Sequence, residues 1–86
     1  MGRRWTVEIE GNKHLIAGEY GEVADSRILV DGNVVYTWHA LQSGDLPKED
    51  VTIKIGTKSG VLKAKGFFHQ NLELFVEGRK IQPDKK

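Results

Sequence analysis

The feature that most constrains the fold is a phrase that occurs twice: an apolar run, an acidic residue, a glycine and a second strand-like run. The two copies are ILVDGNVV at residues 28–35 and LFVEGRKI at residues 74–81. Asp-Gly between apolar runs is a strong hairpin signal, because a two-residue type I′ turn needs positive φ at both central residues. Glu-Gly is a weaker form of this signal, since Glu tolerates positive φ less well. The phrase therefore predicts a chain built from β-hairpins.

Elsewhere, apolar residues alternate with polar ones at the period of a β-strand. Trp5, Val7 and Ile9 show this pattern first, and Gly11-Asn12 breaks it. The expected strands span residues 5–9, 14–17, 27–30, 33–38, 51–55, 61–67 and 72–76, with a short return through 81. Seven or eight short strands joined by frequent turns predict an all-β fold, a compact antiparallel β-sandwich or a barrel-like sheet.

A chain of 86 residues is expected to form one domain with a modest core. We expect this domain to span residues 1–82 and the last residues, 83–86, to form a flexible tail. Residues 40–50 are the longest irregular stretch. They are not expected to be a domain boundary, because neither half could form a core alone.

The composition excludes several classes of function. The net charge is +1 and the chain has no cysteine, which rules out disulfides and thiolate metal sites. No apolar run approaches the roughly 18 residues of a membrane span. The paired arginines after Gly2 are not followed by the apolar region of a signal peptide. A cytoplasmic protein without a membrane partner is therefore expected.

Four lysines are predicted to share one sheet face. With a turn at residues 57–60, Lys54 lies opposite Lys63, while Lys65 shares their face and Lys58 lies in the turn. One interpretation is a solvated outer face that blocks edge pairing. The other is a site for an anionic partner such as nucleic acid, although no aromatic residue alternates with these lysines to stack on bases.

No pattern of catalytic or metal-binding residues emerges. The spacing of His14, His39 and His69 matches no compact metal signature, so they are interpreted as ordinary surface residues near turns. Ser26 and Ser43 lack the context of a nucleophile elbow, and the glycines are scattered at turns instead of forming a phosphate-binding loop. We therefore expect no enzyme activity, no cofactor, no metal and no small-molecule substrate.

Two tryptophans are candidates for packing or for partner binding. Trp5 shares its predicted face with other core residues, whereas Trp38 ends a strand beside the stretch 40–50. Such residues most often belong to the core or to a sheet edge. An exposed aromatic beside a long loop can also anchor a partner protein, so Trp38 and His39 are the predicted anchor.

The order of these features resembles the repeating unit of the Fas apoptotic inhibitory molecule (FAIM) family. The matching elements are Trp5-x-Val7, Gly11, His14, Val30-Asp31-Gly32, Trp38, residues 51–56, Gly66-Phe67 and residues 72–80. The resemblance implies an antiparallel β-sandwich without enzymatic activity and with an interaction role. Members of the family are associated with inhibition of cell death and with protection against protein aggregation. They usually carry two such units, so this chain would be a single-unit relative, or a homodimer would replace the pair.

These observations lead to a first hypothesis and two alternatives. The first is a non-catalytic protein-interaction module, regulatory or chaperone-like, which binds a protein partner or a second copy of itself through a strand edge or beside Trp38. The second is a small anion- or nucleic-acid-binding domain that uses the lysine face. The third is a small hydrolase or isomerase, which would require a cleft holding a carboxylate or histidine with a strongly shifted pKa.

Overall fold

A computed structural model describes residues 2–19, 25–39, 47, 49–65 and 71–84. All regular elements in these ranges are strands, and they form two four-stranded sheets ordered β1-β2-β3-β4 and β5-β6-β7-β8. The strands are β1 (Gly2–Ile9), β2 (Asn12–Glu19), β3 (Asp25–Val30), β4 (Asn33–His39), β5 (Val51–Ile55), β6 (Lys58–Lys65), β7 (Asn71–Val76) and β8 (Arg79–Ile81). Every pairing is antiparallel between consecutive strands, which confirms the predicted fold class.

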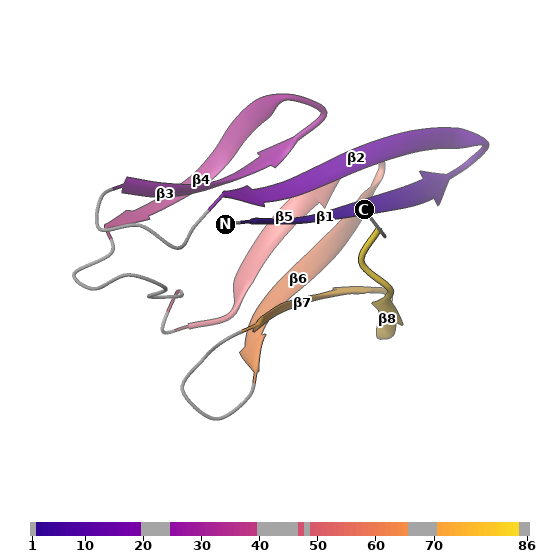
Figure 1. The fold of residues 1–86 in the computed structure, drawn as a ribbon. Helices are drawn as coiled ribbons and strands as arrows, with labels where there is room; N and C mark the ends of the chain where they lie inside the picture. Colours follow the sequence, from indigo (N-terminus) through magenta and orange to yellow (C-terminus); the bar gives the residue numbers. More distant parts are fainter. Residues whose placement is uncertain (1, 20–24, 40–46, 48, 66–70, 85–86) are drawn as a thin grey trace.

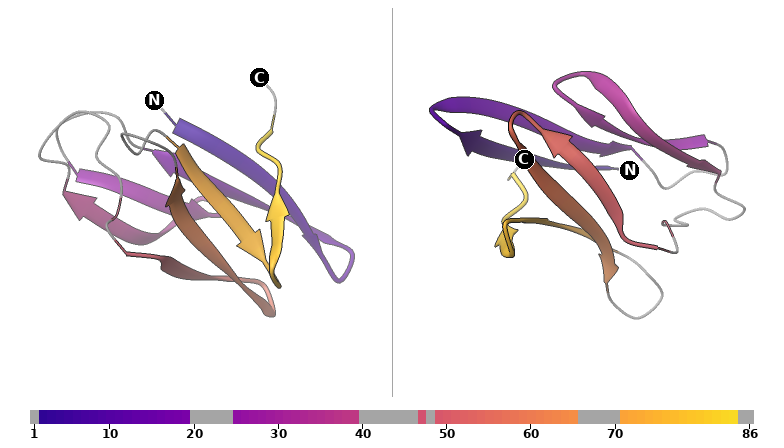
Figure 2. Two further views of the ribbon diagram at one scale, coloured as in Figure 1. Left: turned by 90° about the horizontal axis from the view of Figure 1, so that it is seen from below. Right: turned by 180° about the vertical axis from the view of Figure 1, so that it is seen from behind.

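The two sheets pack face to face around one apolar core, with the β1–β4 sheet above the β5–β8 sheet in Figure 1 and the same two layers visible in Figure 2. Alternation along each strand sends one set of side chains inward. The largest fully buried side chains are Trp5, Ile16, Ile28, Ile55, Leu62, Leu72 and Leu74. Arg3 Nη1 also bridges the layers by donating to the backbone oxygen of Leu72 at 3.1 Å.

Three of the hairpins close with the same acidic residue–glycine turn. These turns are Glu10-Gly11, Asp31-Gly32 and Glu77-Gly78. In each, the acidic residue has a φ of 51–52° and the glycine a φ of 80–84°, as a type I′ turn requires. The two predicted turns are confirmed. The first hairpin closes with the same kind of turn at Glu10-Gly11, which is one residue before the predicted break at Gly11-Asn12.

The β5–β6 hairpin differs from the prediction. It turns at Gly56-Thr57, with a φ of 60° at Gly56, because glycine at the first central position favours a type II′ turn. The predicted turn at residues 57–60 is therefore wrong, and Lys54 lies opposite Ser59 instead of Lys63. This displacement is an even number of residues, so the same β5 side chains still face the core.

The chain beyond β8 lies along the outer edge of β1. Asp84 N donates to Arg4 O at 2.7 Å, and Thr6 Oγ1 donates to Asp84 Oδ2 at 2.8 Å. These bonds cover part of an edge that would otherwise expose unpaired backbone groups. They also hold the start of the predicted tail against the domain, whereas residues 85–86 lie outside the described residues.

Candidate functional site

The solvent-facing side of the β1–β4 sheet carries a band of apolar residues. Ala17 on β2 lies directly opposite Leu29 on β3, and Leu29 lies opposite Val34 on β4. The neighbours of Ala17 and Leu29 along their own strands are buried, so alternation turns these two side chains outward, and Val34 lies beside Leu29 on the same face. We define the outer apolar patch as Leu15, Ala17, Leu29, Val34 and Val35.

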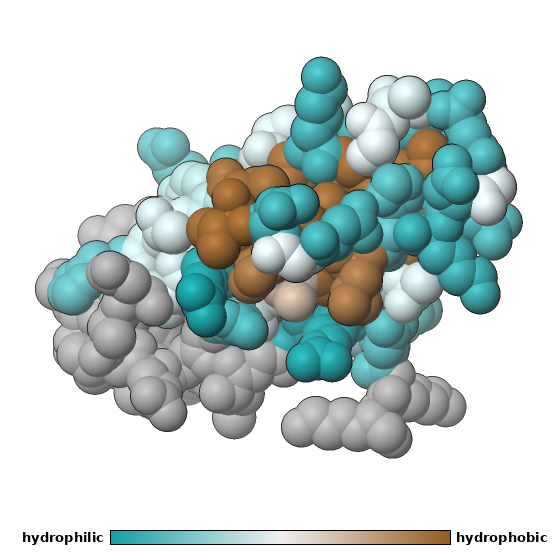
Figure 3. Space-filling model, turned by 90° about the horizontal axis from the view of Figure 1, so that it is seen from above, coloured by the Kyte–Doolittle hydropathy of each residue, from teal (hydrophilic) through white to brown (hydrophobic). Residues whose placement is uncertain are grey.

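This patch is open to solvent at several positions. Leu15, Val34 and Val35 expose 43%, 49% and 45% of their surface, while Ala17 and Leu29 are half-buried. Figure 3 views this face from above and shows apolar atoms gathered at its centre with hydrophilic atoms around them. Single exposed apolar residues are normal, but a contiguous apolar patch with a polar rim marks an interaction surface.

A β-bulge on the edge strand β4 shapes one side of the patch. Tyr36 pairs with Ile28 and Val34 pairs with Leu29, which leaves Val35 as the extra residue between them. Among the strands that the structure describes, β4 pairs only with β3. Bulges twist a strand and interrupt further pairing along its edge. The face of the sheet is therefore a better contact surface than the edge of β4.

Charged residues of both signs flank the patch. On one side, Arg27 Nε donates to Glu19 Oε1 at 2.6 Å across β2 and β3. On the other, Glu8 lies directly opposite Lys13 in the β1–β2 pairing. Opposite charges at these facing positions compensate each other, while Arg4, which is exposed and lies opposite Ala17, adds a positive charge beside the patch.

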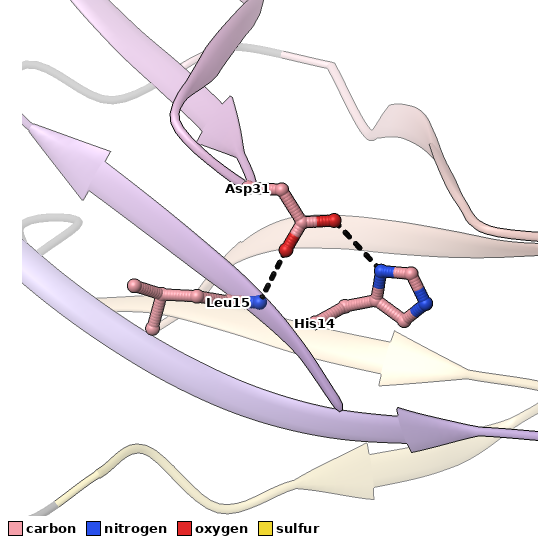
Figure 4. Close-up of polar contacts among 3 residues, drawn as sticks. All are labelled: His14, Leu15 and Asp31. Atoms are coloured by element: carbon pink, nitrogen blue, oxygen red, sulfur yellow. Dashed lines mark hydrogen bonds and ion pairs between the residues drawn. The ribbon is translucent and has the colours of Figure 1, made fainter. Parts of the chain in front are cut away.

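A second cluster of polar residues lies where the hairpin turns meet, and Figure 4 shows its centre. Asp31 Oδ1 accepts from the backbone N of Leu15 at 2.9 Å, and Asp31 Oδ2 accepts from His14 Nδ1 at 2.7 Å. Asp31 N also donates to Leu15 O at 2.8 Å. The β3–β4 turn is thus fixed onto β2 by three hydrogen bonds.

The other edge of the His14 ring contacts the second sheet. A Cβ added to Gly56 would lie 3.0 Å from His14 Nε2, so the imidazole packs closely on the β5–β6 turn. Thr57 Oγ1 in that turn donates to the carboxylate of Glu10 in the first turn. The ring of His14 bridges two turns and is only 18% exposed, so its interpretation as an ordinary surface residue is wrong. The geometry suits a structural clamp.

The environment of Asp31 predicts a measurable response to acid. The hydrogen bond from His14 and the backbone bond from Leu15 lower the pKa of Asp31 from its ordinary value of 3.8. Because the unfolded chain then binds this proton more readily, the contribution of Asp31 to stability is full above its ordinary pKa and is lost as the pH falls through the lower folded pKa.

We therefore expect Asp31→Asn, which keeps a residue suited to the type I′ turn, to be less stable than the original chain near neutral pH. The difference in the free energy of unfolding between the two proteins should shrink as the pH falls below about 4. Urea titrations at a series of pH values measure it. A difference that is unchanged down to about pH 2 would show that the carboxylate is not the cause.

The predicted lysine face is interleaved with carboxylates. Lys63 lies opposite Glu73 in the sheet, with its Nζ 3.8 Å from Asp50 Oδ2 and 5.5 Å from the centre of the Phe75 ring. Two further ion pairs are Lys58–Glu77 at 3.7 Å and Lys80–Glu73 at 2.6 Å. Lys54 points outward from β5, and the side chain of Lys65 lies outside the described atoms. The like-charged pairing of Lys54 with Lys63 does not form. The predicted place of Lys58 in the turn is also wrong, because Lys58 is the first residue of β6 and lies opposite the core residue Ile55.

The predicted aromatic anchor lies at the end of β4. Trp38 is half-buried, packs against the core and lies 6.1 Å from the ring of Tyr36, while His39 is exposed. The structure therefore places Trp38 partly in the core and leaves its role in partner binding as a prediction. Trp5 is fully buried, and its Nε1 has no hydrogen-bond partner in the described part of the chain.

Comparison with known proteins adds no relative: no family model, no curated protein and no solved structure matches the chain. Within the described ranges, no group of three or more metal-ligating side chains comes together. The same ranges contain no helix long and apolar enough to span a membrane.

The outer apolar patch was missed by the sequence analysis. Its members lie on three strands, so the patch becomes visible only when the register of those strands is known. One signal was nevertheless present in the sequence. Residues 28–30 are apolar without interruption, which places an apolar side chain on both faces of the strand. In an antiparallel sheet, such a run indicates that the outer face also carries apolar side chains. Either another part of the protein covers them or they form a contact surface.

Proposed function

We propose that this chain is a non-catalytic protein-interaction module that binds its partner through the outer apolar patch. The observation that carries the proposal is the contiguous row of Ala17, Leu29 and Val34 on the solvent side of the β1–β4 sheet, extended by the exposed Leu15. Burial of apolar area is the main favourable term in most protein association. The charged residues on both flanks would form the polar rim of such an interface.

The lysine face supports the alternative function less well. A site for nucleic acid gains its affinity from cations that neutralise phosphates. Here Lys63 and Lys80 lie near carboxylates on the outer face of the sheet, and Lys58 lies near Glu77. These exposed pairs contribute little stability, but they offset the positive potential that would attract a phosphate backbone.

The resemblance to the FAIM family agrees with a non-catalytic role, and we retain it as part of the proposal. The matching motifs are turn and core residues, such as Asp31 and Trp5, which specify a fold and not a binding site. The hydrogen bonds of Asp31 to β2 explain why a Val-Asp-Gly turn and a histidine occur together in this chain. A role in regulating cell death or in preventing aggregation remains a prediction.

The test of the proposal is a double substitution in the patch, Leu15→Asp with Val34→Asp. Both side chains are substantially exposed, so the variant should remain folded, which circular dichroism checks because the new carboxylate at Leu15 lies near Asp31. We expect the variant to lose the proteins that the original chain captures from a lysate of its native source. Quantitative mass spectrometry of the captured proteins, with nuclease treatment and at two salt concentrations, measures this loss.

The matched control is Thr52→Asp with Ser59→Asp, which adds the same charges to the outer face of the β5–β8 sheet at exposed positions. This control should retain all captured proteins. Equal capture by the patch variant and the original chain would exclude the patch as the binding surface. Capture that the control loses, and that disappears with nuclease or high salt in the original chain and in the patch variant, would favour the lysine face instead.

A further inference from the structure

The geometry points to a specific occupant of the outer apolar patch: a second copy of this chain, packed face to face about a two-fold axis that runs parallel to the strands between β2 and β3. This inference rests on the proposed function and names the partner of the same surface. It follows from the register of two facing pairs, Ala17 with Leu29 and Glu19 with Arg27. Each pair has one member on β2 and the other on β3.

A two-fold axis in this position exchanges β2 and β3 between the copies. Ala17 of one copy then lies over Leu29 of the other, so a small side chain meets a large one at the centre. By the same operation, Glu19 of one copy lies over Arg27 of the other, and the contact occurs twice. The two strand directions remain close to parallel, as in the aligned packing of two β-sheets, where they differ by about 30°.

Charge favours a second copy over a ligand of one sign. Glu19 and Arg27 are each about half exposed, at 51% and 53% of the side chain, so both can contact a partner without leaving their sheet. A uniformly anionic or cationic partner would be attracted by one of them and repelled by the other. The second copy presents the opposite charge to each residue, which is the complementarity that specific interfaces require.

The test uses two charge reversals, R27E and E19R, prepared separately. Each places like charges at both symmetry-related contacts, so we expect the dissociation constant of each homodimer to rise by about tenfold or more. When the two variants are mixed, every contact between copies again joins opposite charges, and a heterodimer should form. The strands within each copy keep their like-charged pair, so recovery on mixing reports the interface alone. Sedimentation equilibrium and native mass spectrometry measure the species.

The matched control is K80E, which reverses one charge of the comparable Lys80–Glu73 pair on the outer face of the other sheet. It should dimerise as the original chain does. Circular dichroism checks that all variants fold. Homodimers that persist in R27E and E19R would overturn the proposed axis. Loss of both homodimers without formation of a heterodimer in the mixture would also overturn it.

A chain that stays monomeric up to about 1 mM would overturn the inference as a whole. That result is distinguishable from failure of the proposed function. If other proteins are still captured in a manner that depends on Leu15 and Val34, the patch binds a different partner. If neither self-association nor such capture is found, the proposed function fails as well.

Discussion

Replacing Trp5 with alanine is expected to lower the free energy of unfolding by about 3–5 kcal/mol, which is the usual range for removing a buried tryptophan. Trp5 is fully buried between the sheets and is the largest of the fully buried side chains. Its removal deletes apolar contacts and leaves a cavity. The surrounding strands are held in place by their hydrogen bonds, so they can move to fill this cavity only in part. Single domains have free energies of unfolding of about 5–15 kcal/mol. If the original chain lies near the lower value, this variant would be partly unfolded at room temperature.

Chemical denaturation followed by circular dichroism measures this loss, and two variants give the comparison. Trp5→Phe keeps an aromatic ring and removes an indole N–H that has no partner within the described residues, so it should cost much less than alanine. Trp38→Ala removes a side chain of the same kind from a half-buried position and should also cost less. If Trp5→Ala costs no more than Trp38→Ala, then Trp5 is not the centre of the core.

The hairpins could be predicted because their turns depend on local conformation. Asp31-Gly32 and Glu77-Gly78 both adopt positive φ, and glycine tolerates this region without strain. The phrase at residues 28–35 therefore determines its turn with little help from the rest of the chain. The sandwich follows from several such hairpins, each of which must cover an apolar face.

The β5–β6 register could not be predicted in the same way, because the sequence offers two candidate turn residues, Gly56 and Gly60. The sequence predicts Gly60 as a turn residue, yet it lies buried within β6 opposite Ile53. A glycine inside a strand often marks a place where neighbouring groups approach closely, and sequence alone does not separate this role from a turn. Period-two alternation still predicted the inward face of β5, because a shift by an even number of residues preserves it.

The candidate interaction surface was harder to predict than the core, for a physical reason. Core residues are recognised one strand at a time by their alternation. The outer apolar patch instead depends on Leu15, Leu29 and Val34 from three strands, and its charged flank depends on the pairing of β2 with β3. The position of His14 between two turns likewise needs the packing of one sheet on the other. Such sites become visible only when long-range pairing is known.

Replacing Gly60 with valine is expected to destabilise the domain by about 1–3 kcal/mol, the usual cost of overpacking a core. A Cβ at this position would lie 3.0 Å from Ile55 Cδ1, 3.2 Å from Leu74 Cδ1 and 3.4 Å from Phe75 O. The two methyl groups end flexible side chains and can move a few tenths of an ångström for a single added carbon. The two further carbons of valine would have to enter the same tightly filled space between β5, β6 and β7.

Gly60→Ala separates this packing effect from backbone effects. Glycine in a strand interior is less stable than alanine by about 0.5–1 kcal/mol, and this gain offsets the cost of one close contact. Alanine should therefore be nearly neutral, and the large loss should appear only with valine. Equilibrium unfolding in urea measures both variants under one condition. Equal losses for alanine and valine would locate the constraint in the backbone, whereas no loss for either would show that the core beside β6 has room for a side chain.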